Sequence, residues 1–246
     1  MFAALVLVAA SFLNCGKHHD PDTPTTAGRD IAQLRPQPPG SPIGNRDSLI
    51  QSIKPKLTPW VAMWKQALPG FAAESLFRIG EAPAFRGGVT QPLRNVYPPT
   101  DENQSVVFQV LGEDSPDGRQ RLIFDCYQYV SDDAGEIETG GDVDSAPLLL
   151  DRSRGTSTQF DFCGPLCGFD WGAWISSKAF VLGGSAGDDA GGPWRQGSLK
   201  IYSLHDSTVV TYVTRFASSE ETARYRSAWR SWLAPRYRAA MKHRPG

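Results

Sequence analysis

AFVL at 179–182, SLKIYSL at 198–204 and TVVTYVTR at 208–215 are the runs of sequence that decide the fold. They are rich in β-branched and aromatic residues, which is typical of strands. The turn residues His205-Asp206-Ser207 separate the last two runs, and a glycine-rich segment, which we interpret as a loop, separates the first two. We therefore expect three consecutive antiparallel strands in the C-terminal half of the chain.

Strand-like runs with a period of two also occur upstream, from about residue 75 onward. The turn signal DSPDG at 114–118 joins two of these runs, and Ser153-Arg154-Gly155 joins two more. The first predicted hairpin pairs Ser105–Leu111 with Arg119–Val130, and the second pairs Leu148–Asp151 with Thr158–Phe162.

The stretch from Trp174 to Tyr212 resembles a blade of a β-propeller. A propeller needs at least four blades, and the chain has no room for four. We therefore predict a mainly β domain of the α+β class. Its expected form is an antiparallel meander or small sandwich, flanked by an N-terminal and a C-terminal amphipathic helix.

The N-terminal helices are predicted by capping residues and by apolar spacing. Ser48–Ile53 indicates a short helix, and Thr58-Pro59 is typical of an N-cap followed by proline at the first helical position. The second helix carries an apolar stripe at helical spacing, formed by Trp60, Met63, Trp64, Ala67 and Leu68. We expect this stripe to be a buried packing face.

The C-terminal helix is predicted from Ser218 and Glu221, whose spacing is that of a capping box. Its expected buried stripe is Tyr225, Trp229 and Trp232, and Pro235 is expected to break or kink the helix. A helix with interleaved aromatic and Arg residues can also lie at a membrane surface.

Charge is distributed unevenly along a chain whose net charge is −1. Residues 101–190 contain 17 Asp and Glu against 5 Lys and Arg, whereas residues 220–246 contain 7 Lys and Arg against two Glu. A basic tail can bind anionic lipid or nucleic acid. We favour the alternative, in which the basic helix lies across the acidic β region of its own chain, and we predict no nucleic-acid partner.

The N-terminus consists of an apolar run from Met1 to Phe12 that is followed shortly by Cys15-Gly16. A dozen apolar residues are too few to span a bilayer as a helix and have the length of a secretory signal. The run with its cysteine resembles the lipobox of bacterial lipoproteins. That resemblance implies a signal peptide over 1–14, acylation of Cys15 by palmitate and anchoring to a bacterial membrane. Gly16 implies the outer membrane where the source has one.

Two other interpretations of the N-terminus stay open, namely an ordinary cleaved signal in which Cys15 is incidental, and a cytoplasmic protein with an apolar N-terminus. Residues 15–44 contain six prolines and few apolar side chains, which predicts a disordered tether. Such a coil spans roughly 30 Å on average. We expect a single globular domain over residues 45–246.

Three cysteines remain besides Cys15. Cys163-Gly-Pro-Leu-Cys167 brackets a turn, which makes these two residues the candidate disulfide, and a bond from Cys126 to either is the alternative. A zinc site from the three cysteines and His205 has only weak support from this spacing. We predict no metal and no cofactor.

Two motifs suggest chemistry. GGSAG at 183–187 matches the nucleophile motif G-x-S-x-G of α/β-hydrolases, but the residues after it do not favour the helix that the motif requires, so we interpret it as a glycine-rich hairpin loop. The second motif is a group of six carboxylates that suits Ca²⁺ but is expected to be a solvated acidic loop: Asp132, Asp133, Glu136, Glu138, Asp142 and Asp144.

These observations predict a lipid-anchored protein of the cell envelope that acts as a non-enzymatic binding or interaction module, with an envelope protein as a possible partner. No residue is predicted to be catalytic. The alternatives are a secreted or anchored hydrolase that uses Ser185 or the acidic segment, and a calcium-stabilised β domain.

Overall fold

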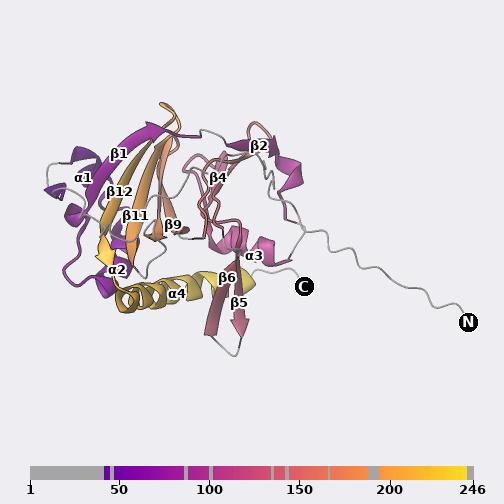
Figure 1. Cartoon of the computed structure of the whole chain (residues 1–246). Coiled ribbons are helices and arrows are strands. Elements are labelled where there is room, and N and C mark those ends of the chain that lie inside the picture. The colour runs from indigo at the N-terminus through magenta and orange to yellow at the C-terminus, as the bar shows by residue number, and fades with distance from the viewer. Residues whose placement is uncertain are drawn as a thin grey trace, which may run out of the picture. The chain divides into compact units, whose positions relative to one another are not determined.

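The C-terminal strands form a five-stranded antiparallel sheet, sheet A, in the order β1-β12-β11-β10-β9 (Figure 1). Its strands are β1 (Phe77–Pro83), β9 (Cys167–Ser176), β10 (Ala179–Gly187), β11 (Arg195–Ser203) and β12 (Thr208–Ala217). The computed structural model describes residues 42–44, 47–85, 88–99, 102–133, 136–141, 144–165, 167–187 and 194–242. All of them belong to one compact unit, Leu34–Gly246.

The predicted strands at 179–182, 198–204 and 208–215 are confirmed as β10, β11 and β12, and the order β9 to β12 is a meander. The prediction that GGSAG at 183–187 belongs to a glycine-rich loop is wrong, because β10 continues through these residues to Gly187. Tertiary packing explains these glycines. A Cβ at Gly183 would lie 2.5 Å from Cδ1 of Trp60, and a Cβ at Gly184 would overlap the carbonyl oxygen of Gly168.

A second five-stranded antiparallel sheet, sheet B, has the order β2-β8-β7-β4-β3. Its strands are β2 (Val89–Pro92), β3 (Gly112–Asp114), β4 (Gln120–Ile123), β7 (Leu148–Asp151) and β8 (Thr156–Gln159). The second predicted hairpin is confirmed, because β7 pairs with β8. The predicted turn at 114–118 is also present, but it joins β4 to the short strand β3 and not to Ser105–Leu111.

Two predicted strands of the first hairpin are wrong in extent or in type. Ser105–Leu111 lies mostly in a helix, α3 (Glu102–Val110), whose buried residues include Val106, Val107 and Val110. These positions are helical neighbours, so burial on one helix face overrides the strand preference of valine. Arg119–Val130 is not one strand, because β4 ends at Ile123 and Gln128 begins β5 (Gln128–Asp133) in another sheet. The partner of β5 is β6 (Glu136–Gly141).

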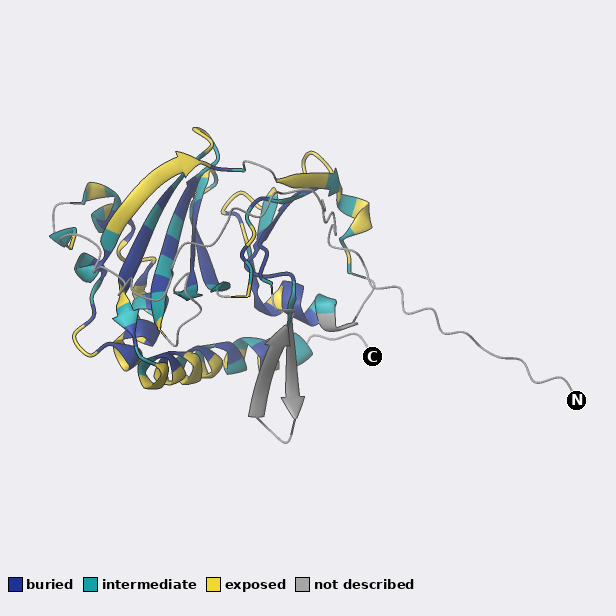
Figure 2. Cartoon of the chain, viewed as in Figure 1, coloured by how far each residue is buried: buried dark blue, intermediate teal, exposed yellow. Residues whose placement is uncertain are grey.

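Sheets A and B lie next to each other, and much of their strands is coloured as buried (Figure 2). A Cβ at Gly172 of β9 would lie 2.6 Å from the Phe124 ring, which follows β4, so the sheets approach closely there. The indole Nε1 of Trp174 donates to the carbonyl of Glu113 in β3 at 2.9 Å. Ring contacts link residues of both layers: Phe85, Phe160, Trp174, Phe180 and Tyr202. The predicted α+β class with an antiparallel sandwich is therefore confirmed.

The N-terminal helices cover the other face of sheet A. They are α1 (Ser48–Ile53) and α2 (Thr58–Ala67), and the short 3₁₀ segments η3 (Ala73–Ser75) and η4 (Leu93–Asn95) follow. Trp60 and Trp64 of α2 are fully buried, and they occupy the space above Gly183 and Gly197. The predicted stripe is confirmed. The N-cap, however, is Leu57, and Thr58 begins the helix.

The C-terminal helix, α4 (Ser219–Lys242), contacts α2, α3, β12 and β6. Its capping box is confirmed, because Oγ of Ser218 accepts from Glu221 N at 3.2 Å and the Glu221 carboxylate accepts from Ser218 N at 2.8 Å. Pro235 lies inside the helix and does not end it. The buried stripe continues from Tyr225 and Trp229 to Leu233 and Tyr237, whereas Trp232 is partly exposed. The contact with β6 is the one that the charge pattern favours.

Candidate functional site

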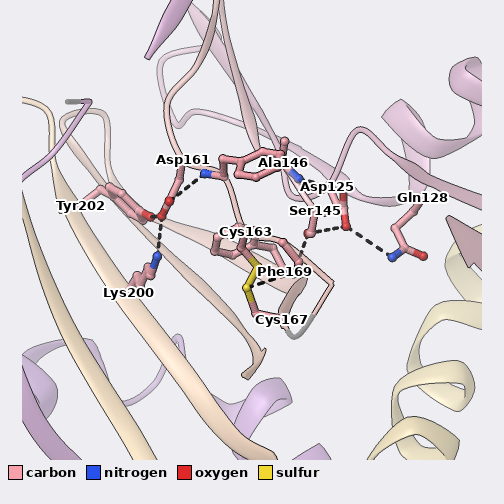
Figure 3. Close-up of a disulfide and its surroundings, with 12 residues drawn as sticks. Asp125, Gln128, Ser145, Ala146, Asp161, Cys163, Cys167, Phe169, Lys200 and Tyr202 are labelled. Atoms are coloured by element: carbon pink, nitrogen blue, oxygen red, sulfur yellow. Dashed lines mark hydrogen bonds and ion pairs between the residues drawn. A yellow bond between two sulfur atoms is a disulfide. The ribbon is translucent and has the colours of Figure 1, made fainter. Parts of the chain in front are cut away.

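The disulfide joins Cys163 and Cys167 across the predicted Gly-Pro turn, with a Cα–Cα distance of 5.7 Å (Figure 3). Cys163 also pairs with Ser145 through two backbone hydrogen bonds of 2.8 Å. Cys126 is buried and does not take part in the disulfide. The disulfide therefore holds the segment that leaves sheet B at the start of β9.

A buried carboxylate, Asp125, lies beside this segment (Figure 3). It accepts from Oγ of Ser145 at 2.5 Å and from the backbone N–H groups of Tyr127 and Ala146 at 3.0 and 3.2 Å. Burial raises the pKa of Asp125 to about 6, although these hydrogen bonds lower it. Ser145 in turn accepts from Phe169 N at 3.1 Å, so its hydroxyl joins β9 to Asp125.

A second carboxylate, Asp170 of β9, fastens α4 to sheet A. Its side chain accepts from the hydroxyl of Tyr225 at 3.0 Å, and its carbonyl accepts from Nε1 of Trp229 at 2.8 Å. Burial raises the pKa of Asp170 to about 6, and the charge of Asp125 raises it as well. Both carboxyl groups therefore keep a proton up to about pH 6, well above the range of an ordinary aspartate.

A third polar group lies on the other side of the disulfide (Figure 3). The carboxylate of Asp161 accepts from Nζ of Lys200 at 2.6 Å and from the hydroxyl of Tyr202. Burial and the neighbouring charge of Asp161 raise the pKa of Tyr202 well above its usual value. The Lys200 ammonium also lies 5.3 Å from the centre of the Phe169 ring. Within this group, each charge is neutralised by a partner.

An open groove runs between α2 and α4 and has a volume of about 490 Å³. Its lining comes from both helices and includes the buried Met63 at its floor: Pro59, Ala62, Met63, Gln66, Arg224, Ser227, Ala228, Ser231 and Trp232. The Arg224 guanidinium donates to the carbonyl of Gln66 at 3.1 Å, which joins the first turns of α4 to the end of α2. The Arg236 guanidinium lies 4.6 Å from the centre of the Trp232 ring, so a cation also lies beside that part of the lining.

The cations of α4 divide into those that hold the fold and those that face solvent. Arg224 bonds the last carbonyls of α2, and Arg236 donates to the carbonyl of Val110 at the end of α3. These bonds satisfy carbonyl groups that a helix leaves unpaired at its C-terminus. Arg230, which is exposed, and Lys65 on the exposed side of α2 form no ion pair with any described residue. Neither of these two residues lines the groove, whose lining cation, Arg224, also pairs with the Glu220 carboxylate at 2.7 Å.

The hydrolase motif does not form a nucleophile elbow. Ser185 lies within β10, opposite Gly168 and Gly197 in the neighbouring strands. His205 follows the far end of β11, eight residues after Gly197, which corresponds to ~26 Å of extended chain. The same separation keeps His205 from Cys167, which pairs with Ala186. The part of the chain that the structure describes contains no group of three His, Cys, Asp or Glu side chains that could hold a metal ion.

Two of the remaining predicted site residues lie outside what the structure describes. Cys15 and Asp142 are not among the described residues. The acidic segment is not a loop, because four of its six residues, Asp132, Asp133, Glu136 and Glu138, lie in the β5–β6 hairpin. Calcium binding there stays an untested alternative. Among the described helices, none has the length and apolar character needed to cross a membrane.

Sequence reasoning did not find the groove. The sequence feature that marks the groove is a set of small residues in the two helices, such as Ala62, Ala228 and Ser231. Small residues of this kind are common on exposed helix faces, so they do not single out a groove. Comparison of the chain with known protein families, with curated proteins and with solved structures finds no match.

Proposed function

We propose that the chain is a lipid-anchored module of a bacterial cell envelope that binds a partner through the α2–α4 groove. The groove carries this proposal, because it combines apolar lining residues such as Met63 and Trp232 with polar ones such as Gln66 and Arg224, and it is open to solvent. Binding surfaces commonly have an apolar centre and a polar or charged rim.

The anchor part of the proposal rests on Cys15 and the apolar run before it. The disulfide supports export, because disulfides persist in oxidising compartments and are rare in the cytosol. The proline-rich residues between Cys15 and the first helix supply a tether of roughly 30 Å. The globular domain would then reach a partner beside the membrane.

The geometry supports binding rather than hydrolysis. A serine nucleophile needs a base within hydrogen-bond reach. Ser185 of β10 pairs with Gly197 near the start of β11, whereas His205 follows the other end of β11. The carboxylates with raised pKa, Asp125 and Asp170, bond to groups of the protein itself. Their contacts fasten β9 and α4, which is a structural task.

Metabolic labelling with a clickable palmitate analogue tests the anchor in a bacterial host. The wild-type chain and a Cys126→Ala variant, which removes another cysteine, are expected to carry the label and to fractionate with membranes. The Cys15→Ala variant is expected to lose both properties. Equal labelling of Cys15→Ala, or soluble wild-type protein without label, would contradict the proposal.

A further inference from the structure

Polar groups at a buried position make the contact between α4 and β9. The Tyr225 hydroxyl donates to the Asp170 carboxylate at 3.0 Å, and Nε1 of Trp229 donates to the Asp170 carbonyl at 2.8 Å. The two aromatic residues are only 1% and 6% exposed, so water has little access to these bonds. They lie one helical turn apart, and both hydrogen bonds therefore hold the same face of α4 against one residue of the sheet.

The Asp170 carboxylate has little compensation for a negative charge. Among the described residues, the Tyr225 hydroxyl is its hydrogen-bond donor. The charge of Arg226 lowers the pKa of Asp170, but burial outweighs it and raises that pKa to about 6. A buried carboxylate with so few partners is costly to ionise, because it gives up its hydration.

A second buried carboxylate, Asp125, acts on the same position. The Ser145 hydroxyl donates to Asp125 at 2.5 Å and accepts at 3.1 Å from the backbone N–H of Phe169, the residue before Asp170. The charge of Asp125 raises the pKa of Asp170, and burial raises the pKa of Asp125 itself to about 6. When both groups ionise, like charges repel each other beside a contact that already lacks water.

The other charged groups around this contact lie at its edges. Strand β10, which pairs with β9, contains no titratable residue. Glu113 of β3, whose pKa burial also raises, faces the C-terminal part of β9. Lys65 of α2 and Arg215 of β12 are exposed. Asp170 and Asp125 are therefore the described groups that decide the charge at the contact itself.

We infer that the contact between α4 and β9 is a latch controlled by protons, which is tight while Asp170 is protonated and loosens when Asp170 and Asp125 both carry charge. A protonated Asp170 still accepts from Tyr225 and has no charge to be solvated. The same turn of α4 supplies Ser227 and Ala228 to the α2–α4 groove, so the latch also holds one wall of that groove. The inference concerns neither the anchor nor a partner, and it does not rest on the proposed function.

Hydrogen–deuterium exchange of the full chain in mild detergent, at pH 5 and at pH 8, tests the latch. Protection factors correct for the pH dependence of exchange itself. They are compared between peptides of α4 from Thr222 to Leu233 and peptides of β11, the central strand of sheet A. The variants are Asp170→Asn and Asp125→Asn, and Asp206→Asn at an exposed position is their control. Thermal unfolding checks that each variant is folded.

Protection of the α4 peptides is expected to fall about tenfold from pH 5 to pH 8 in the wild type and in Asp206→Asn. One carboxyl group gives this ratio when its pKa is about 6 in the closed contact and 3.8 in the open one. The β11 peptides should change much less. Asp170→Asn should remove most of the fall, and Asp125→Asn should reduce it, because Asp170 then meets less repulsion.

Three results would overturn the inference. The first is equal protection of the α4 peptides at both pH values in the wild type. The second is an equal loss in the α4 and β11 peptides, because that loss would report the stability of the whole fold. The third is a folded Asp170→Asn or Asp125→Asn variant that keeps the full fall. The wild-type comparison decides between a latch and none even where a variant does not fold.

Discussion

Asp170→Asn is expected to stabilise the protein at alkaline pH and to leave its stability nearly unchanged at about pH 4. Asp170 fastens β9 to α4, and burial raises its pKa from 3.8 to about 6. The protonated form is therefore the one that the fold favours. Its stabilisation is fully present below the unfolded-state pKa of 3.8 and is lost as the pH rises through about 6. Asparagine keeps an oxygen that can accept from Tyr225 but does not ionise.

The magnitude follows from the difference between the two pKa values. A difference of roughly 2 units at about 1.4 kcal/mol per unit gives about 3 kcal/mol. The free energy of unfolding of Asp170→Asn should therefore exceed that of the wild type by about 3 kcal/mol at pH 8. Part of the pH dependence should remain in the variant, because Asp125 is also buried with a raised pKa.

Urea unfolding followed by tryptophan fluorescence between about pH 4 and pH 8 measures this effect. Asp206→Asn is the matched control. Asp206 is exposed, and its pKa is lowered by hydrogen bonds from His205 and Ser203, so its replacement should bring no gain at pH 8. A loss of stability in Asp170→Asn at pH 8, relative to the wild type, would show that the charge of Asp170 stabilises the fold and would refute the reasoning.

Three further predictions concern stability, each measured by denaturant unfolding. Gly184→Ala should cost about 3 kcal/mol or more, because its Cβ would overlap a backbone carbonyl, whereas Gly80→Ala, with open space around it, should be nearly neutral. Reduction of the Cys163–Cys167 disulfide should cost about 2 kcal/mol, since it closes a short loop; no change would mean that the bond does not form. Ser218→Ala should cost about 1 kcal/mol through loss of the α4 cap, and an equal loss in Ser52→Ala would argue against capping.

The parts of the fold that the sequence predicts correctly are those in which local preference and tertiary packing agree. β11 and β12 combine strand-forming residues with a tight turn, and the α4 cap combines Ser218 with Glu221. The predictions fail where packing overrides local preference. Valines at 106, 107 and 110 favour a strand but are buried on one face of α3. Gly183 favours a loop but makes room for Trp60 within β10.

The candidate site was less predictable than the fold. The pairing of Cys163 with Cys167 could be proposed because a short turn brings the two residues together. The groove could not, because it depends on the spacing and direction of α2 and α4, which lie far apart in the sequence. Asp125 and Asp170 gave no sequence signal, since only the fold buries them together beside Ser145 and Tyr225.

Intact-mass and N-terminal peptide analysis of the protein extracted from bacterial membranes tests the proposed function most directly. The account predicts a mature chain whose first residue is Cys15, with the mass of a diacylglyceryl group on its sulfur. A mature chain that begins elsewhere, or one that begins at Cys15 with an unmodified thiol, would contradict the proposal of a lipid-anchored envelope module.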